Sequence, residues 1–174
     1  MGQAIIDLQH LAKKFGNQTV LKVSNLTVNP GEIVGLMGPS GPGKSTVIKV
    51  TLGMEVASGG SAKVFDTTMP NRELLGRIGY MAQTDALYDA LSGRENLKFY
   101  GLMKGIAKQD IKSEVDYVAK VVDLTKDLDK RVAGYSGGMM RRLSLAIALM
   151  GKPDLLILDE PTVGIDPALR RQIW

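Results

Sequence analysis

The chain has 174 residues, 44% of them hydrophobic and 23% charged, with a formal net charge of +4. These values are typical of one soluble globular domain that is large enough for its own core. The sequence contains no cysteine, which excludes disulfides and thiolate metal sites and fits a reducing compartment. No apolar run reaches the roughly 18 residues needed to cross a bilayer, no secretory signal opens the chain, and no basic block favours nucleic-acid binding.

The N-terminal part of the chain predicts β-strands. Residues 4–11 alternate weakly between apolar and polar, and residues 19–28 are rich in β-branched side chains. A short apolar run at 32–37 leads directly into a glycine-rich loop, as a buried strand would. Residues 44–53 then predict a helix that Gly53 ends.

The middle of the chain predicts one more strand, at 77–82, and then helices. Ser92, with Glu95 three residues later, has the pattern of a capping box at a helix start. A second helix is indicated by apolar residues at helical spacing with charges on the other face: Ile111, Val115, Val118 and Val122. Residues from about 85 to 134 are therefore predicted to form a helical insertion within an α/β chain.

A glycine-rich loop at 38–46 reads GPSGPGKST and matches the pattern G-x-x-x-x-G-K-[ST] at Gly38, Gly43, Lys44 and Ser45. The glycines allow the backbone to curl until its N–H groups face a phosphate, and the following helix adds the positive end of its dipole. Lys44 can then reach the outer phosphates, and the Ser45 hydroxyl can ligate Mg²⁺. The strand–loop–helix context argues against a chance glycine turn before a lysine. The loop is therefore predicted to bind phosphates.

Pro42 is an unusual residue within this loop. Proline has no backbone N–H, so it removes one donor that the loop could offer to a phosphate. We expect the nucleotide affinity to be lower because of it.

A second motif, LLILDEPT at 155–162, places two carboxylates after four apolar residues. The apolar run predicts a buried strand, and ligands bind at the C-terminal edge of a parallel α/β sheet. Asp159 can hold Mg²⁺ there through water, and Glu160 can orient or deprotonate an attacking water. Apolar strands that end in acidic residues are common, so this motif is strong evidence for a nucleotide site only in combination with the phosphate-binding loop.

A third motif, YSGGMMRR at 135–142, predicts the start of a helix that Ser136 can cap. Met140, Leu143 and Ile147 form its apolar face. Glycines are poor helix formers, so two of them after the cap indicate a function. A serine and two glycines at a helix N-terminus make a second anion site.

With these three motifs, the sequence resembles the ATP-binding subunit of ABC transporters along nearly its whole length. The segments 38–46, 155–160 and 135–139 are similar to the family's Walker A, Walker B and signature motifs. MAQTDALYDALSGRENL at 81–97 resembles the Q-loop region, and TVGIDP at 162–167 resembles the D-loop. The motifs occur in the order typical of the family, so the resemblance is specific.

The resemblance implies an α/β fold: a P-loop NTPase sheet with an N-terminal antiparallel β part and an inserted helical subdomain at about 85–134. Residues 1–174 would form one ATP-binding domain that is incomplete at its C-terminus. ATP and Mg²⁺ are the implied ligands. The implied catalytic residues are Glu160, Gln83 and Lys44, and the implied Mg²⁺ ligands are Ser45, Gln83 and Asp159. The implied nucleotide-binding residues are Phe15, where the family places an adenine-stacking aromatic, and Gly38, Pro39, Ser40, Gly41, Gly43, Lys44, Ser45, Thr46, Ser136, Gly137, Gly138 and Asp166.

The family's mechanism gives the two anion sites a common role. Two subunits pair head to tail, and each ATP lies between the Walker A motif of one subunit and the signature motif of the other. Ser136 and Gly138 would then contact the γ-phosphate bound across the dimer. Binding closes the dimer, hydrolysis opens it, and transmembrane permease subunits convert this cycle into transport. The protein is therefore expected at the cytoplasmic face of the cell membrane, without a nucleic-acid partner.

The sequence also departs from the commonest family pattern. Tyr135 and Met139 replace a leucine and a glutamine; with the arginines that follow and the segment PTVGIDP, they resemble the branch that serves ABC-2-type exporters of drugs, lipids and polysaccharides. Phe15 replaces the more usual tyrosine and keeps the capacity to stack. The family's switch histidine lies beyond the Walker B strand, whereas the single histidine of this sequence is His10, which we interpret as structural. We therefore expect the chain to lack the last strand or strands and the histidine loop.

Other functions of related nucleotide-binding proteins are alternatives. A P-loop GTPase would need a base-reading motif such as N-K-x-D, which the sequence lacks. A DNA-repair or chromosome ATPase would carry long coiled coils or a basic face, and a translation factor of the superfamily would have two such domains in tandem. A regulatory module that binds nucleotide without turnover is a further alternative, against which Glu160 argues.

Overall fold

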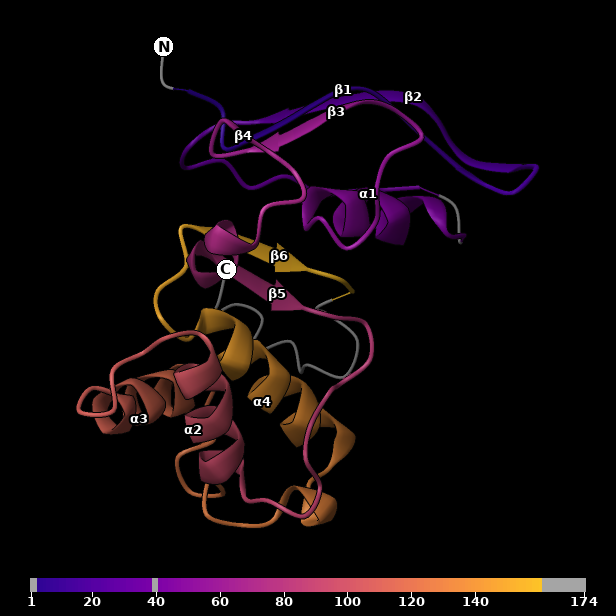
Figure 1. The fold of residues 1–174 in the computed structure, drawn as a ribbon. Helices are drawn as coiled ribbons and strands as arrows, with labels where there is room; N and C mark the ends of the chain where they lie inside the picture. Colours follow the sequence, from indigo (N-terminus) through magenta and orange to yellow (C-terminus); the bar gives the residue numbers. More distant parts are fainter. Residues whose placement is uncertain (1–2, 39–40, 161–174) are drawn as a thin grey trace. The chain divides into compact units, whose positions relative to one another are not determined.

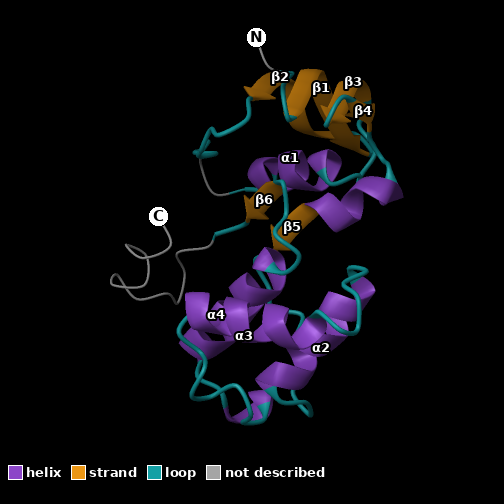
Figure 2. Ribbon diagram, turned by 90° about the vertical axis from the view of Figure 1, so that its left-hand side faces the viewer, coloured by secondary structure: helices purple, strands orange, loops and turns teal. Residues whose placement is uncertain are grey.

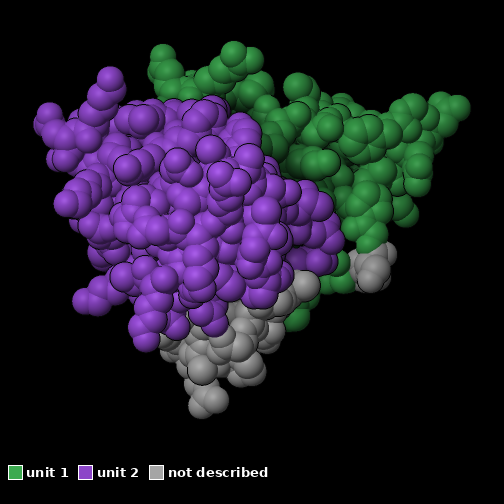
Figure 3. Space-filling view, turned by 90° about the horizontal axis from the view of Figure 1, so that it is seen from below, with its two compact units in different colours: residues 1–73 green, residues 74–174 purple. Residues whose placement is uncertain are grey.

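The computed structural model describes residues 3–38 and 41–160 of the chain. The chain divides into two compact units, unit 1 at residues 1–73 and unit 2 at residues 74–174 (Figure 3). Each unit has its own secondary structure. The segment at 162–167, which resembles the D-loop, lies outside the described residues.

In the described part of unit 1, four strands form an antiparallel sheet in the order β2-β1-β3-β4 (Figure 1). The first two strands form a long hairpin, as the patterns at 4–11 and 19–28 predict. Gly16 in its turn has a φ of +55°, a backbone conformation that costs glycine little. The strands are β1 (Ile6–Phe15), β2 (Gln18–Val28), β3 (Gly59–Val64) and β4 (Thr67–Thr68).

The helix α1, Gly43–Thr51, lies against one face of this sheet (Figure 2). Its Ile48 and Val50 are buried, and burial of each such side chain is worth about 1.5–3 kcal/mol. The predicted end of the helix is confirmed, because Gly53 follows it with a φ of +71°. A Cβ at Gly53 would also lie 2.7 Å from the Cβ of Pro70, so both the backbone and the available space require glycine.

The predicted strand at 32–37 is wrong. Residues 32–38 have no regular secondary structure, and Ile33 and Met37 are 82% and 96% exposed. An apolar run indicates burial, but a strand forms only where a neighbouring backbone completes its hydrogen bonds. The described strands of unit 1 pair with one another and leave this segment outside the sheet.

In unit 2, β5 (Ile78–Met81) and β6 (Leu155–Leu158) pair in parallel, which confirms the strands predicted there. Three helices pack together in the same unit (Figures 1 and 2). They are α2 (Gly93–Met103), α3 (Ile111–Val121) and α4 (Gly137–Leu149). Two 3₁₀ turns accompany them, at Arg72–Arg77 and at Val132–Gly134, and the first of these spans the boundary between the units. None of the helices that the structure describes has the length and apolar character needed to span a membrane.

The local signals predicted for the helices of unit 2 are present. The Ser92 hydroxyl accepts a hydrogen bond from the N–H of Glu95, and the Glu95 carboxylate accepts one from the N–H of Ser92, which completes the capping box. The predicted apolar residues of α3 and its C-cap are buried in the core of the unit. Because this unit also contains α4 and the two strands, the limits of a helical subdomain at about 85–134 stay a prediction.

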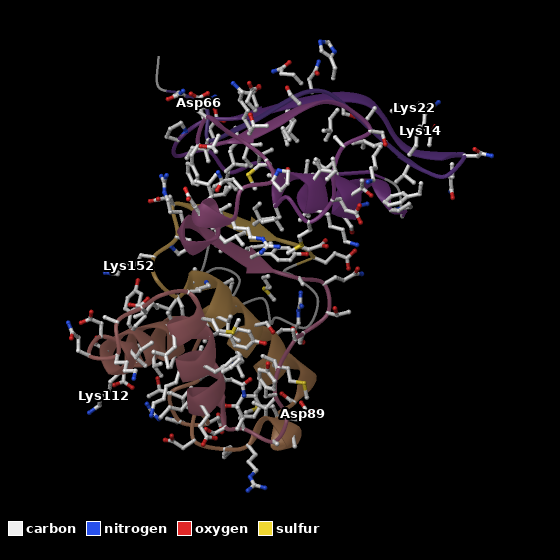
Figure 4. The ribbon with its side chains drawn as sticks, in the orientation of Figure 1. Lys14, Lys22, Asp66, Asp89, Lys112 and Lys152 are labelled. Carbon is white, nitrogen blue, oxygen red and sulfur yellow. The ribbon has the colours of Figure 1, made fainter. Side chains whose placement is uncertain are left out.

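Charged side chains extend from several elements of the chain. Figure 4 labels Lys14 and Lys22 on the hairpin of β1 and β2, Lys112 on α3, and Lys152 in the segment before β6. These lysines come from both units, so the positive charge of the sequence is not confined to one of them.

Candidate functional site

The glycine-rich loop leads into the N-terminus of α1 in unit 1. Pro42 is the N-cap residue of this helix, and its side chain makes no capping hydrogen bond. The Lys44 ammonium donates a hydrogen bond to the carbonyl of Gly38 at 2.8 Å, so it reaches back across the loop. The Thr46 hydroxyl and N–H both donate to the Pro42 carbonyl, at 2.6 and 2.9 Å, and hold the first turn of the helix. Pro39 and Ser40, which were predicted to bind nucleotide, lie outside the described residues.

The start of α1 has the chemistry that a polyphosphate requires. The first N–H groups of a helix have no partner within it and carry the positive end of its dipole. The first turn of α1 contains no acidic residue that would oppose an anion, and Lys44 adds a full positive charge there. A hydroxyl at the next position, Ser45, suits a divalent cation beside the phosphates. The residues present therefore fit a bound nucleotide with Mg²⁺.

Phe15 lies at the end of β1 in the same unit, and 45% of its surface is exposed. The ammonium of Lys13 lies 4.8 Å from the centre of the ring, on the same strand face two residues earlier. Lys13 is itself held by Glu55 at 3.0 Å and by the carbonyl of Val56 at 2.7 Å. This support orients the ring while leaving it accessible, which suits a base-stacking role that stays a prediction.

In unit 2 the parallel register of β5 and β6 brings two predicted site residues together. Met81 pairs with Leu158, and the N–H of Asp159 continues the ladder by donating to the Met81 carbonyl at 2.9 Å. The chain therefore leaves both strands at the same edge. There the Gln83 amide donates to the Glu160 carboxylate at 3.1 Å, and both residues are exposed. The family resemblance implied a catalytic role for each of these residues, but the sequence contains no signal for this direct bond.

The predicted Mg²⁺ ligands divide between the units, with Ser45 in unit 1 and Gln83 and Asp159 in unit 2. In the described ranges, no three acidic, histidine or cysteine side chains cluster as a metal cage. Mg²⁺ is ordinarily bound through one or two carboxylates, water and substrate phosphates, so a single carboxylate such as that of Asp159 suffices for such a site. Burial, and then the charge of Asp159, raise the pKa of the neighbouring Tyr80.

The signature motif begins α4. The Ser136 hydroxyl accepts a hydrogen bond from the N–H of Met139 at 3.2 Å, which confirms the predicted cap. Gly137 and Gly138 form the first two positions of the helix, and the first turn contains no acidic residue. Ser136 and Gly137 are exposed, so a ligand can approach the first N–H groups of the helix. Asp166, also predicted to bind nucleotide, lies outside the described residues.

Tyr135, which departs from the commonest signature, is a buried anchor for this helix start. Its side chain is 6% exposed, and its hydroxyl donates to the carbonyl of Asp127 at 2.9 Å. Burial, followed by the charges of Asp127 and Asp129, raises the pKa of Tyr135 and keeps the hydroxyl a donor. A Cβ at Gly93 would lie 2.2 Å from the Tyr135 hydroxyl oxygen, so the larger side chain here requires glycine in the first turn of α2.

Arg141 is a site residue that the sequence interpretation missed. It lies on α4, is 7% exposed, and donates hydrogen bonds to the backbone carbonyls of both Gln83 and Glu160. In the sequence it appeared only as one of the arginines that follow the signature. The available signal was a charged residue between Met140 and Leu143 of the predicted apolar face, which is too weak to predict burial.

The family model described as ABC transporter matches residues 21–163, which contain the phosphate-binding loop, the signature and the two acidic residues after β6. The chain belongs to the ABC transporter family. Several curated proteins named Nod factor export ATP-binding protein I are similar to it. The one from Rhizobium sp. (strain N33) is 40% identical over 176 residues, covering 100% of this chain and 58% of that protein. The one from Rhizobium meliloti is 40% identical over 171 residues, covering 97% of this chain and 51% of that protein. The chain thus spans little more than half the length of these relatives.

Solved ABC structures confirm the predicted fold class. An ATP-binding subunit of an ABC transporter has a TM-score of 0.87 at 25% identity, over 97% of this chain and 71% of that one. A dimeric ATP-binding cassette in a post-hydrolysis state, bound to ADP and Pi, has a TM-score of 0.85 at 25% identity, over 97% of this chain and 79% of that one. The cbiO1 protein of Clostridium perfringens, part of an ABC transporter complex, has a TM-score of 0.83 at 26% identity, over 98% and 70%.

Proposed function

We propose that this chain is the ATP-binding and ATP-hydrolysing part of an ABC transporter, and that the transporter is an exporter. The observation that carries the proposal is the hydrogen bond between Gln83 and Glu160 at the carboxyl ends of two parallel strands, in a chain that also contains a complete phosphate-binding motif. The family match and the similarity to proteins named for export support it.

Residues of unit 1 bind and orient the nucleotide in this proposal. The N–H groups at the start of α1 and the ammonium of Lys44 receive the β- and γ-phosphates, and Lys44 exchanges its bond to the Gly38 carbonyl for a phosphate oxygen. Phe15 stacks on the adenine. Ser45, Asp159 and Gln83 would hold Mg²⁺, which supplies positive charge against the phosphate oxygens when it is bound.

Residues of unit 2 direct the chemical step. Glu160 accepts a proton from a water molecule while the water oxygen bonds to the γ-phosphorus. The bond from that phosphorus to the bridging oxygen breaks, and ADP and phosphate leave. The Gln83 amide, which donates to the Glu160 carboxylate, holds that carboxylate in one orientation and can also orient the water.

A second copy or a related subunit is expected to complete the site. The start of α4, with Ser136 and Gly137 exposed, offers N–H groups to a phosphate that the same chain already binds through α1. A head-to-tail pair would give both helix starts a role in phosphate binding, because each α4 start then faces the nucleotide of the partner. Two of the similar solved structures are described as dimeric. Transmembrane permease subunits would recruit such a pair to the cytoplasmic face of the membrane.

The test compares ATP binding and turnover in the full-length protein. Glu160→Gln keeps the shape of the side chain but removes the base, so phosphate release should fall at least a hundredfold while ATP still binds. Lys44→Ala should nearly abolish binding of a fluorescent ATP analogue, because it removes the full positive charge of the loop. Lys49→Ala, on the exposed side of the same helix, is the matched control and should bind normally.

The results separate the proposal from its alternatives. A wild-type protein that binds ATP but releases no phosphate above background would be a regulatory module. Unchanged turnover in Glu160→Gln would remove that residue from the mechanism. Equal nucleotide affinity in Lys44→Ala and wild type would contradict the binding site itself.

A further inference from the structure

We propose that Arg141 is a positioning residue for hydrolysis, which ties the start of α4 to the two segments that present Gln83 and Glu160. The inference rests on the proposed function, because it assigns Arg141 a task in the same reaction. It goes further in giving a role to a residue to which the sequence interpretation assigned none, and in linking the signature helix to the catalytic pair within one unit.

The guanidinium of Arg141 bridges the ends of β5 and β6. Its Nη1 donates to the carbonyls of Ala82 and Gln83 at 2.9 and 3.1 Å, on the segment that follows β5. Its Nη2 donates to the carbonyls of Asp159 and Glu160 at 3.4 and 3.1 Å, on the segment that follows β6. One side chain therefore fixes the backbone on both sides of the bond between Gln83 and Glu160.

The side chain of Asp85 makes a second connection between the segment after β5 and α4. Its carboxylate accepts a hydrogen bond from Arg141 Nη1 at 3.1 Å and one from the Ser144 hydroxyl at 2.6 Å. Arg141 and Ser144 are three residues apart and lie on the same face of the helix. The chain after Gln83 is thus held to α4 at two successive points.

Burial makes a purely stabilising role for Arg141 a poor explanation. The side chain is 8% exposed, and Nε is buried without a hydrogen-bond partner in the described part of the chain. Moving a charged group out of water is expensive, and a buried ion pair is weak evidence of stabilisation, since an apolar side chain of similar size often does as well. An apolar side chain, however, cannot donate the hydrogen bonds that hold four carbonyls of two segments in one geometry.

The backbone of Glu160 shows why such a hold is needed. Its φ is +51°, in the left-handed region that residues other than glycine, asparagine and aspartate rarely adopt. A residue in this conformation is strained and persists only where its surroundings enforce it. Arg141 donates hydrogen bonds to the Asp159 and Glu160 carbonyls, which belong to the peptide groups before and after the α-carbon of Glu160. These hydrogen bonds therefore restrict both φ and ψ of Glu160. Arg141 therefore holds the carboxylate where the reaction needs it.

The experiment measures steady-state ATP hydrolysis and nucleotide affinity of the full-length protein with Arg141→Lys. Lysine keeps the charge but lacks the planar fork, so it cannot bridge both segments at once. We expect kcat to fall at least tenfold, while the affinity for ATP changes less than twofold. The control is Arg131→Lys, since Arg131 is an exposed arginine of the same unit outside the motifs. This control should keep kcat within twofold of wild type.

A double variant distinguishes positioning from general damage. If Arg141 acts through Glu160, then Arg141→Lys combined with Glu160→Gln hydrolyses ATP no more slowly than Glu160→Gln alone. Independent effects would multiply, and that result would overturn the inference. Normal turnover in Arg141→Lys would also overturn it and leave the proposed function intact, whereas normal turnover in Glu160→Gln would count against the proposed function itself.

A second variant covers the case in which Arg141→Lys does not fold. Asp85→Asn keeps the acceptor for Ser144 but removes the charge that faces Arg141, and the Asp85 side chain is already 21% exposed. We expect a decrease in kcat of threefold or more with unchanged ATP affinity and an unchanged circular dichroism spectrum. An unchanged kcat in Asp85→Asn would overturn the inference.

Discussion

Pro42 lacks two hydrogen-bonding groups that another residue could supply at the start of α1. It lacks an N–H to offer to a phosphate, and as the N-cap residue it makes no side-chain hydrogen bond to the first turn. Serine would supply both an N–H and a capping hydroxyl. We therefore predict that Pro42→Ser tightens ATP binding by about 1 kcal/mol, or roughly fivefold, as one regained hydrogen bond would.

Titration of a fluorescent ATP analogue measures this effect, and Pro42→Ala separates its two causes. Alanine restores the N–H without the hydroxyl, so equal gains in both variants assign the effect to the backbone donor. Weaker binding in Pro42→Ser than in wild type would show that the rigidity of the proline matters more than the missing donor.

At the scale of elements, Lys104 connects the end of α2 to the end of α4. Its ammonium donates to the carbonyls of Ile147, Ala148 and Met150 at 2.7, 3.2 and 3.3 Å, so a positive charge lies at the negative end of the α4 dipole. Burial nevertheless lowers the pKa of Lys104 to about 8 from the ordinary 10.5, against the opposing effect of Glu114. The stability of this junction should therefore depend on pH.

The sign of that dependence follows from proton binding. Between about pH 8 and pH 10.5 the unfolded chain binds more protons at Lys104 than the folded one, so the free energy of unfolding rises with pH through this group. We predict that the free energy of unfolding of wild type, minus that of Lys104→Met, increases from pH 8 to pH 10 by at most about 1.4 kcal/mol per pH unit. Urea titrations followed by circular dichroism measure it, and a flat or falling difference would contradict the burial of the ammonium.

At the scale of the whole molecule, the proposed pairing of two chains would give each of the two predicted anion sites a role. Gly137 offers a clean way to test this, because a Cβ there would meet nothing within 4 Å. Gly137→Asp places a carboxylate at the N-terminus of α4, where it should stabilise the helix by about 0.3–1 kcal/mol. The same charge would repel the phosphate of a nucleotide bound by the partner.

We predict that full-length Glu160→Gln protein forms a dimer in ATP and Mg²⁺ and that adding Gly137→Asp abolishes it. Size-exclusion chromatography with light scattering gives the mass, with ADP as the nucleotide control and Gly137→Ala as the steric control. A dimer that persists in the Gly137→Asp protein, with ATP bound, would place the start of α4 outside the interface.

The local features of this protein are determined by its sequence alone. The capping box at Ser92, the buried stripe of α3 and the serine cap of α4 were all predicted correctly, and each depends on residues three or four positions apart. Helical geometry brings such residues into contact whatever surrounds them. The phosphate-binding loop was also predicted from a local pattern, because the backbone curvature that such a loop needs is permitted by a few nearby glycines.

The contacts between distant segments were decided by the tertiary structure. Gln83 and Glu160 are 77 residues apart, and Arg141 lies 58 residues from Gln83, so no periodicity of the sequence records that they touch. The apolar run at 32–37 also shows what sequence patterns cannot predict, because its composition indicates burial and yet it forms no strand. Hydrophobicity and propensity act on each residue by itself, whereas a strand partner or a buried arginine depends on which distant backbone groups are left to complete its hydrogen bonds.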